Sequence, residues 1–190
     1  MLTFINLNET KQNSIRFNEP GNYVIFFYNI SGEYEFNIQS PNVNLNIFGL
    51  YVGKNNNNFS LQTVQKHQAH SSTSNLFIKG VFYDSSKFQY KGLVRIEKNA
   101  QKSHAYQKNQ NLILSEKVFV QSKPYLEILT NDVFCTHGST TGKLNKDEMY
   151  CLESRGIDNK AAQNLLVDGF INDIIIRVKE RYPQFKFNLL

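Results

Sequence analysis

Cysteine is scarce in this sequence, because only Cys135 and Cys151 occur among its 190 residues. A small secreted domain held together by disulfides has many more cysteines, so we expect these two thiols to be free. Tryptophan is absent and proline occurs four times. Asn-Gly and Asp-Gly, the dipeptides of tight hairpin turns, are missing from residues 1–137. The sequence therefore speaks against a disulfide scaffold and against a meander of hairpins.

Long hydrophobic runs are also missing, since no stretch approaches the 18 or more apolar residues that are typical of a membrane span. The start, MLTFINLNETK, has no basic region before an apolar run and no small-residue cleavage pattern. We therefore expect a cytoplasmic protein, or a stromal one if a plastid encodes it, with no membrane partner.

The positive charge is scattered along the chain. The net charge is +5, from 21 Lys and Arg against 16 Asp and Glu. The nearest approach to a cluster is Lys98, Lys102 and Lys108, and these lie among Asn and Gln rather than in an aromatic platform that could stack bases. We interpret the lysines as a solvated surface and expect no nucleic acid partner.

Helix-length apolar periods are missing from the first 137 residues, which excludes a βαβ architecture. Nine segments rich in β-branched and aromatic residues occur there instead, and several alternate apolar with polar residues, as residues 42–47 do. These predicted strands are residues 23–30, 34–38, 43–52, 59–64, 76–83, 88–96, 111–114, 118–122 and 125–130. A sandwich, a barrel and a solenoid remain open.

Asparagine favours the solenoid among these three. The chain holds 24 Asn, many of them at breaks between predicted strands. There Asn tolerates left-handed backbone, and side-chain amides can stack from coil to coil. The strand starts are spaced irregularly, so no formal repeat can be assigned.

Two helices are predicted at the C-terminal end. Asn145 with Glu148 forms a capping box, and Gly156 supplies a stop, which together predict a helix over about residues 146–155. Asp158 caps a second helix that continues to Arg181. Its apolar face is unusually wide, so we expect it to pack in a cleft or to dock onto a partner. The residues expected to bind that partner are Leu165, Leu166, Phe170 and Ile174.

No enzymatic motif is complete. Residues 138–143, GSTTGK, have one residue too few between the glycines for a phosphate-binding loop, and Leu144 stands where a magnesium-binding hydroxyl would be needed. Neither paired carboxylates in a Gly-rich setting nor a Ser-His-Asp elbow is present, so we expect no enzyme.

The remaining chemical candidate is Cys135-Thr136-His137. Residues i and i+2 of a strand point to the same face about 6–7 Å apart, so Cys135 and His137 could address one metal ion. A buried cysteine beside a hydrogen-bonded histidine is the commoner explanation of such a pair and stays open. Two cysteines cannot supply the four thiolates of an ordinary iron–sulfur cluster, so another chain would have to complete any such site.

Residues 100–170 resemble the C-terminal core of the SufB/SufD family, the scaffold subunits of the SUF iron–sulfur cluster assembly system. Lys79-Gly80 and Tyr90-Lys91-Gly92 also resemble the core of this family. The motifs that match in order and spacing are Pro124 to Ile128, Asp132-Val133, Cys135-x-His137-Gly138, Gly142, Tyr150 to Ile157, Leu165-Leu166 and Gly169-Phe170.

The resemblance implies a mainly β fold: a right-handed parallel β-helix, here over residues 1–144, followed by C-terminal α-helices over residues 145–190. It implies a SufB-like partner for the β-helix and a SufC-like ATPase for the helices. It also maps a functional cysteine and histidine onto Cys135 and His137, where a transient iron–sulfur cluster or iron would be shared with a partner chain.

The chain is closer to SufD than to SufB. SufB-like chains have glutamate at the position of Gly138 and cysteine at that of Val118. Known members are longer and carry an N-terminal helical region, so this chain is expected to be a minimal form, a fragment or a specialised paralogue. The alternatives are a self-pairing family member that acts as a homodimer and a β-helix enzyme or carbohydrate-binding protein.

Overall fold

The structure is a computed structural model that describes residues 2–10 and 12–188. This part of the chain contains eleven strands followed by two helices. They are β1 (Leu2–Asn6), β2 (Ser14–Phe17), β3 (Gly21–Tyr28), β4 (Gly32–Ile38), β5 (Val43–Gly53), β6 (Asn58–His67), β7 (Thr73–Phe82), β8 (Lys87–Ile96), β9 (Ser103–Ile113), β10 (Phe119–Ile128), β11 (Val133–Gly142), α1 (Lys146–Glu153) and α2 (Asn159–Arg181).

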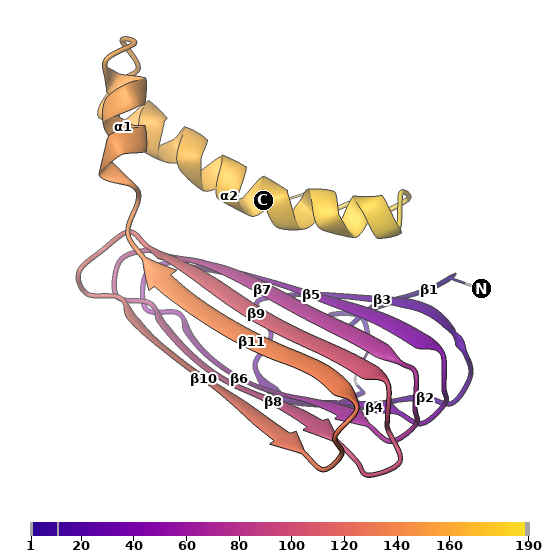
Figure 1. The fold of residues 1–190 in the computed structure, drawn as a ribbon. Helices are drawn as coiled ribbons and strands as arrows, with labels where there is room; N and C mark the ends of the chain where they lie inside the picture. Colours follow the sequence, from indigo (N-terminus) through magenta and orange to yellow (C-terminus); the bar gives the residue numbers. More distant parts are fainter. Residues whose placement is uncertain (1, 11, 189–190) are drawn as a thin grey trace.

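The chain alternates between two stacked parallel sheets, as Figure 1 shows. The odd-numbered strands form sheet A in the order β1-β3-β5-β7-β9-β11, and the even-numbered strands form sheet B in the order β10-β8-β6-β4-β2. Each strand therefore pairs with the strands two before and two after it, which is the connectivity of a solenoid. The predicted β-helix followed by C-terminal helices is confirmed.

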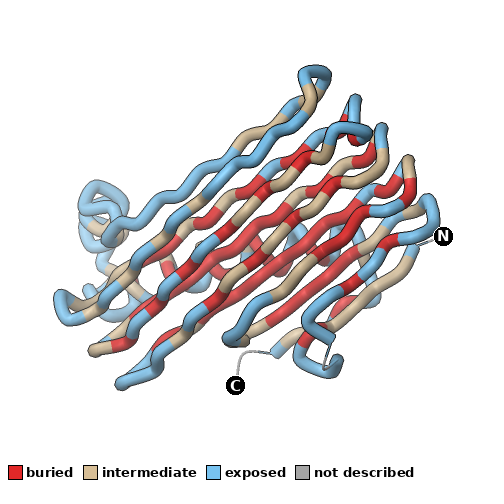
Figure 2. The backbone as a smooth tube through the Cα atoms, turned by 90° about the horizontal axis from the view of Figure 1, so that it is seen from below, coloured by how far each residue is buried: buried red, intermediate tan, exposed pale blue. Residues whose placement is uncertain are grey.

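Alternating side chains fill the space between the sheets. In β8, Phe88 and Tyr90 are buried while Lys87 and Gln89 are exposed. Because paired residues of parallel strands stack in register, buried residues of neighbouring strands lie in columns (Figure 2). The main core cluster extends from Leu7 near the N-terminal end to Tyr90.

Asparagines at the corners of the solenoid adopt the left-handed backbone expected of them. Asn29, Asn42 and Asn55 have φ angles of 51°, 57° and 54°. The side chain of Asn29 donates to the carbonyl of Val52 at 3.1 Å and accepts from its amide at 2.8 Å. An asparagine side chain thus continues the backbone ladder where the strand turns away.

The strand predictions missed β1 and β2 and misplaced the start of β9. The latter begins at Ser103 rather than at residue 111, because polar Gln107 and Asn109 occupy core positions. β10 is one strand across Pro124 rather than two, since a strand that pairs only with β8 tolerates a missing N–H. The GSTTG segment, which was not among the predicted strands, forms the second half of β11.

Helix α2 covers the outer face of sheet A (Figure 1). The Asp158 side chain accepts from the amide of Ala161 at 2.9 Å, which confirms the predicted cap. Six residues of α2, including Ile174 and Val178, are buried, and they pack on outward-facing Val24, Phe48 and Phe77. Neither helix of the described chain is long and apolar enough to cross a membrane.

Candidate functional site

Strands β10 and β11 form the terminal rung of the solenoid, and each ends its sheet in the described chain. Cys135 pairs with Ala105, and His137 pairs with Gln107. Ala105 and Gln107 are 2% and 1% exposed and face the interior. Because stacked residues point the same way, Cys135 and His137 also face inward, toward the uncovered end of the solenoid. We call the inward-facing side of β10 and β11 the open end.

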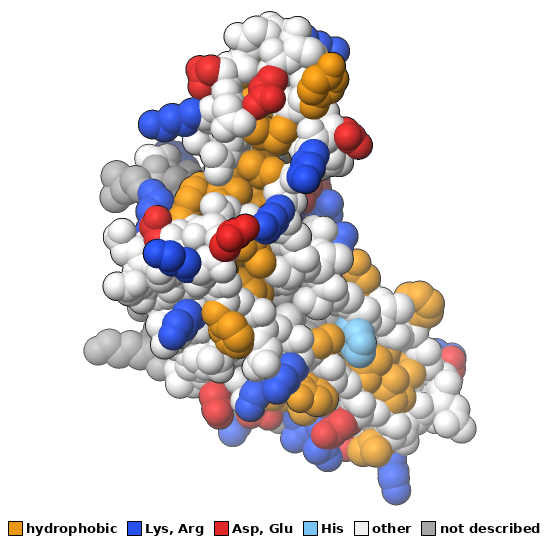
Figure 3. All heavy atoms as spheres, turned by 90° about the vertical axis from the view of Figure 1, so that its left-hand side faces the viewer, with side chains coloured by type: hydrophobic (Ala, Val, Ile, Leu, Met, Phe, Trp, Pro, Cys, Tyr) orange, Lys and Arg blue, Asp and Glu red, His pale blue; other side chains and the backbone are white. Residues whose placement is uncertain are grey.

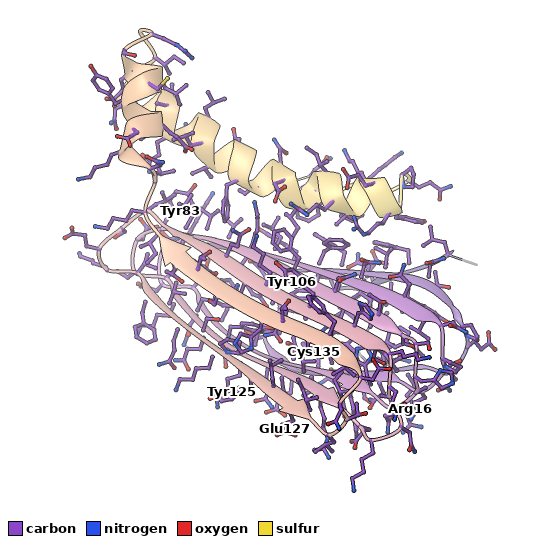
Figure 4. The ribbon with its side chains drawn as sticks, viewed as in Figure 1. Arg16, Tyr83, Tyr106, Tyr125, Glu127 and Cys135 are labelled. Carbon is purple, nitrogen blue, oxygen red and sulfur yellow. The ribbon has the colours of Figure 1, made fainter. Side chains whose placement is uncertain are left out.

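The two side chains meet different surroundings. Cys135 is half-buried and packs against a small cluster that contains Val94 and Ala105, whereas His137 is exposed. Burial raises the pKa of the Cys135 thiol, opposed by a hydrogen bond with the backbone of Ala105. Figure 4 shows Cys135 on β11. The predicted pair thus shares one face, and its sulfur is a protonated thiol at neutral pH.

Exposed hydrophobic side chains lie on the same terminal rung as this pair. Leu126 and Ile128 point inward in register with Val94 and Ile96, yet they are 36% and 42% exposed. Outward-facing Phe134 is 63% exposed. The large hydrophobic residues that are exposed on the terminal rung and its connections are Phe119, Tyr125, Leu126, Ile128, Leu129 and Phe134. Figure 2 shows the same region as a pale band beside the buried strands.

A buried polar group lies deeper in the solenoid and was missed by the sequence analysis. The fully buried His67 shares a 2.7 Å hydrogen bond with Ser74, which also accepts from Gln65 at 2.7 Å. Burial lowers the pKa of His67 to about 4, so its imidazole is neutral. The period-2 pattern of Thr63, Gln65 and His67 could have revealed it, because these residues occupy inward positions of β6.

Cys135 and His137 offer two metal ligands. No group of three or more Cys, His, Asp or Glu side chains in the described residues could hold a metal ion. Cys151 is exposed on α1, beyond the far end of β11 (Figure 1), and does not join them. Two side chains are fewer than the ligands that an iron–sulfur cluster needs.

The helical end carries a second exposed apolar surface. None of the α1 residues is buried, and Tyr150 and Leu165 are 73% and 53% exposed. Leu166 and Phe170 are half-buried. Figure 3, with the helices at the top, shows hydrophobic side chains on this surface. The expectation that Ile174 binds a partner needs correction. Its side chain is 0% exposed because it packs on sheet A.

The fold and these surfaces define a β-solenoid protein that carries a cysteine–histidine pair at its open end and a helical pair on its outer face. The model of the family described as "SUF system FeS cluster assembly, SufBD core domain" matches residues 28–170. The chain therefore belongs to the SufBD family.

The chain matches each of its curated relatives over only part of the relative's length. The chain is similar to the iron–sulfur cluster assembly protein SufD of Escherichia coli, with 28% identity over 77% of this chain and 38% of the relative. A SufBD family protein of Synechocystis is 34% identical over 61% of this chain and 25% of the relative. The chloroplastic protein ABCI7 of Arabidopsis thaliana is 32% identical over 54% of this chain and 21% of the relative. The chain thus spans well under half the length of these relatives.

Proposed function

We propose that this chain is a SufD-like scaffold subunit for iron–sulfur cluster assembly and that a SufB-like chain covers its open end. The observation that supports this most is the exposure of Leu126 and Ile128, at 36% and 42%, although Val94 and Ile96 one rung back are 0% exposed. Side chains that point into a core but meet water are stabilised when a second surface covers them.

The backbone of the terminal rung supports the same partner. β10 pairs only with β8 and β11 only with β9 in the described chain, so each presents an unpaired edge. Such edges accept strands of another chain, and a partner with its own open rung could continue both sheets at once. The interface would bury the exposed hydrophobic residues and enclose Cys135 and His137.

A nascent cluster, or the iron for it, is the substrate of this interface. Cys135 as thiolate and His137 through a neutral imidazole nitrogen would supply two ligands, and the partner chain would supply the rest. Because burial raises the pKa of the Cys135 thiol, ligand binding there must release a proton. A site divided between two chains holds its cargo transiently, as a scaffold requires.

A SufC-like ATPase would dock on the helical end. The exposed Tyr150 and Leu165, with half-buried Leu166 and Phe170, form an apolar surface on α1 and the N-terminal half of α2. Ile174 has no part in it, because its side chain holds α2 on sheet A. Energy from ATP would thus come from a partner, and this chain would have no enzymatic activity by itself.

The SufD-like assignment rests on Gly138 and Val118, where SufB-like chains have glutamate and cysteine. Val118 packs against the main core cluster, so the position serves packing in this chain. The cytoplasm, or the stroma of a plastid, is the compartment that we propose for this work, since one matching relative is chloroplastic.

Self-pairing is the second candidate, supported by the form of the open end. Two copies related by a twofold axis could place their β10 and β11 edges together, because such an interface uses the same surface on both chains. The two cysteine–histidine pairs would then supply four ligands. The oligomeric state of the purified chain with and without a SufB-like chain separates the two candidates.

The pairing is tested by co-purification with a SufB-like chain. Ile128→Asp places a charge on an exposed, inward-facing position of the open end, at the last residue of β10, and should abolish the complex. Gln121→Asp is the matched control, because Gln121 is exposed and faces outward on the same strand. Retention of the complex by Ile128→Asp, in a folded chain, would disprove this interface.

The ligand pair is tested in the complex by loading of iron and sulfide. His137→Ala and Cys135→Ser should leave the SufB-like partner bound and abolish cluster formation. Ser139→Ala, the next inward-facing position of β11, should retain it. Normal cluster formation in the variant with both substitutions would mean that the two residues serve only packing.

Docking of the ATPase is tested by a second pull-down. Leu165→Asp should abolish capture of a SufC-like ATPase while the SufB-like chain remains bound. Asn164→Asp, an exposed neighbour on α2, provides the control. Full capture by Leu165→Asp combined with Tyr150→Asp would disprove the docking surface.

A further inference from the structure

A small groove lies on the outer face of sheet A, beside the C-terminal half of α2 and away from both surfaces described above. Its volume is about 210 Å³. Drug-sized ligands occupy pockets of about 300–1,000 Å³, so this groove admits a smaller molecule or one group of a larger molecule. Six of the side chains that line it are Asn46, Phe77, Tyr106, Lys108, Arg177 and Arg181. Figure 4 marks Tyr106 on this sheet, below α2.

The groove has an excess of positive charge. The strands of sheet A contain no Asp or Glu, so the floor of the groove has no carboxylate. Its three cations are Lys108 from β9 and Arg177 and Arg181 from α2. A concave, partly desolvated surface concentrates such a field more than a flat one does.

The nearby carboxylate of Asp173 is already engaged. Lys79 approaches it at 2.7 Å with a side chain that is 6% exposed, and Arg177 Nε lies 3.1 Å from its oxygens. Lys79 also donates to the carbonyl of Phe170 at 2.9 Å. One carboxylate thus serves two cations. Lys108 and Arg181 do not contact this carboxylate. Arg181 makes only a 3.6 Å approach to the exposed Glu180.

Aromatic rings and amides hold these cations in place without neutralising them. The Arg177 guanidinium lies 4.9 Å from the centre of the Phe77 ring, and Lys108 Nζ lies 5.8 Å from it. Arg181 Nε donates to Asn46 at 3.0 Å, and Asn46 also accepts from Asn75 at 3.2 Å. In the described part of the chain, the side chain of Lys108 makes neither a hydrogen bond nor an ion pair. Its ammonium group is therefore free to donate hydrogen bonds to a ligand in the groove.

We propose that this groove binds a small phosphate anion, either inorganic phosphate or the phosphate monoester end of a small metabolite. A tetrahedral dianion would be matched by Lys108 and Arg181, the two cations that do not contact Asp173, and it is small enough for the volume. Arginine forks and a lysine ammonium are the groups that proteins use for phosphate. This inference does not depend on the proposed role in cluster assembly, because neither the open end nor the helical surface contributes to the groove.

The test is a titration of the full 190-residue chain with inorganic phosphate at constant ionic strength, followed by NMR of the arginine Nε–H groups. The signals of Arg177 and Arg181 should shift and saturate. Lys108→Met should raise the dissociation constant for phosphate about tenfold, because a charge-assisted hydrogen bond is lost. Lys91→Met, which removes an exposed lysine on sheet B, should leave it unchanged. Arg181→Gln is a second variant should Lys108→Met fail to fold.

Two further titrations define the ligand. Glycerol phosphate that binds more tightly than inorganic phosphate would identify a monoester, and the reverse order would identify the free ion. Absence of saturable shifts with both, or equal binding by wild type, Lys108→Met and Arg181→Gln, would overturn the proposal. So would a polyglutamate peptide that shifts the same arginine signals when phosphate does not, because the groove would then recognise an acidic protein segment.

Discussion

The two ends of the solenoid are built from the same kind of rung but are finished differently. At the N-terminal end, inward-facing Ile15 and Phe17 on β2 are 7% and 1% exposed. At the open end, Leu126 and Ile128 on β10 are 36% and 42% exposed. Both ends have unpaired strand edges in the described chain, so an unpaired edge alone does not mark an interface.

Side-chain size explains the difference. At the N-terminal end Phe17 packs edge-on against Tyr23 with ring centroids 4.9 Å apart, and large side chains shield each other across the rung. On β11 the inward positions after Val133 are Cys135, His137, Ser139 and Thr141, which are too small or too polar to close the interior. The N-terminal end is thus closed by its own side chains, whereas the open end leaves apolar side chains exposed.

The largest expected difference is between two phenylalanines. Phe36→Ala removes a ring that is 0% exposed and should lower the free energy of unfolding by about 3–5 kcal/mol. Phe134→Ala on the terminal rung removes a ring that is 63% exposed, so the isolated chain should lose less than about 1 kcal/mol. Urea denaturation of both variants measures this. Equal losses would mean that the Phe134 ring is already covered in the isolated chain.

Acidification should act on the interior between the two ends. The pKa of His67 is about 4 in the folded chain and about 6.5 when unfolded. Below pH 6.5 the unfolded state therefore binds a proton that the folded state does not, and stability falls until about pH 4. The difference is about 3 kcal/mol, and above pH 6.5 His67 contributes no such loss.

The measurement is thermal or urea unfolding across this pH range for the wild type and His67→Gln. Carboxylates titrate in the same range, so the informative quantity is the difference between the two curves. The wild type should lose more stability on acidification than the variant does. Parallel curves would show that His67 is protonated without unfolding.

The sequence predicts most of the long strands from their apolar residues, but it misses the short β1 and β2 and the first part of β9. In β9, inward-facing Gln107 and Asn109 alternate with Tyr106 and Lys108, so the pattern does not show which face is buried. The same ambiguity hides the inward orientation of His137, whose direction follows from its register with Gln107. The shared face of Cys135 and His137 was predictable from their spacing, whereas the open end depends on where the rungs stop.

Two isoleucines one above the other distinguish the open end from the core directly. Ile128 stacks in register on Ile96, and they are 42% and 0% exposed. Ile96→Val should destabilise the chain by about 0.5–1.5 kcal/mol, and Ile128→Val by much less. In the complex with a SufB-like chain, Ile128→Val should weaken binding by a similar 0.5–1.5 kcal/mol. Isothermal titration of both variants tests this, and an unchanged affinity for Ile128→Val would place the partner elsewhere.

The smallest expected effect is that of a glycine-to-alanine change on the terminal strand, and it should raise stability rather than lower it. A Cβ atom on Gly138 or Gly142 would meet nothing within 4 Å, because both lie on the exposed terminal strand. Gly138→Ala should therefore stabilise the isolated chain by about 0.4–1 kcal/mol, by reducing the freedom of the unfolded state. On Gly49, in the core, a Cβ would overlap the Phe27 ring, so Gly49→Ala should destabilise. Thermal unfolding measures both, and a loss of stability in Gly138→Ala would mean that backbone strain, rather than open space, keeps glycine at this end of the solenoid.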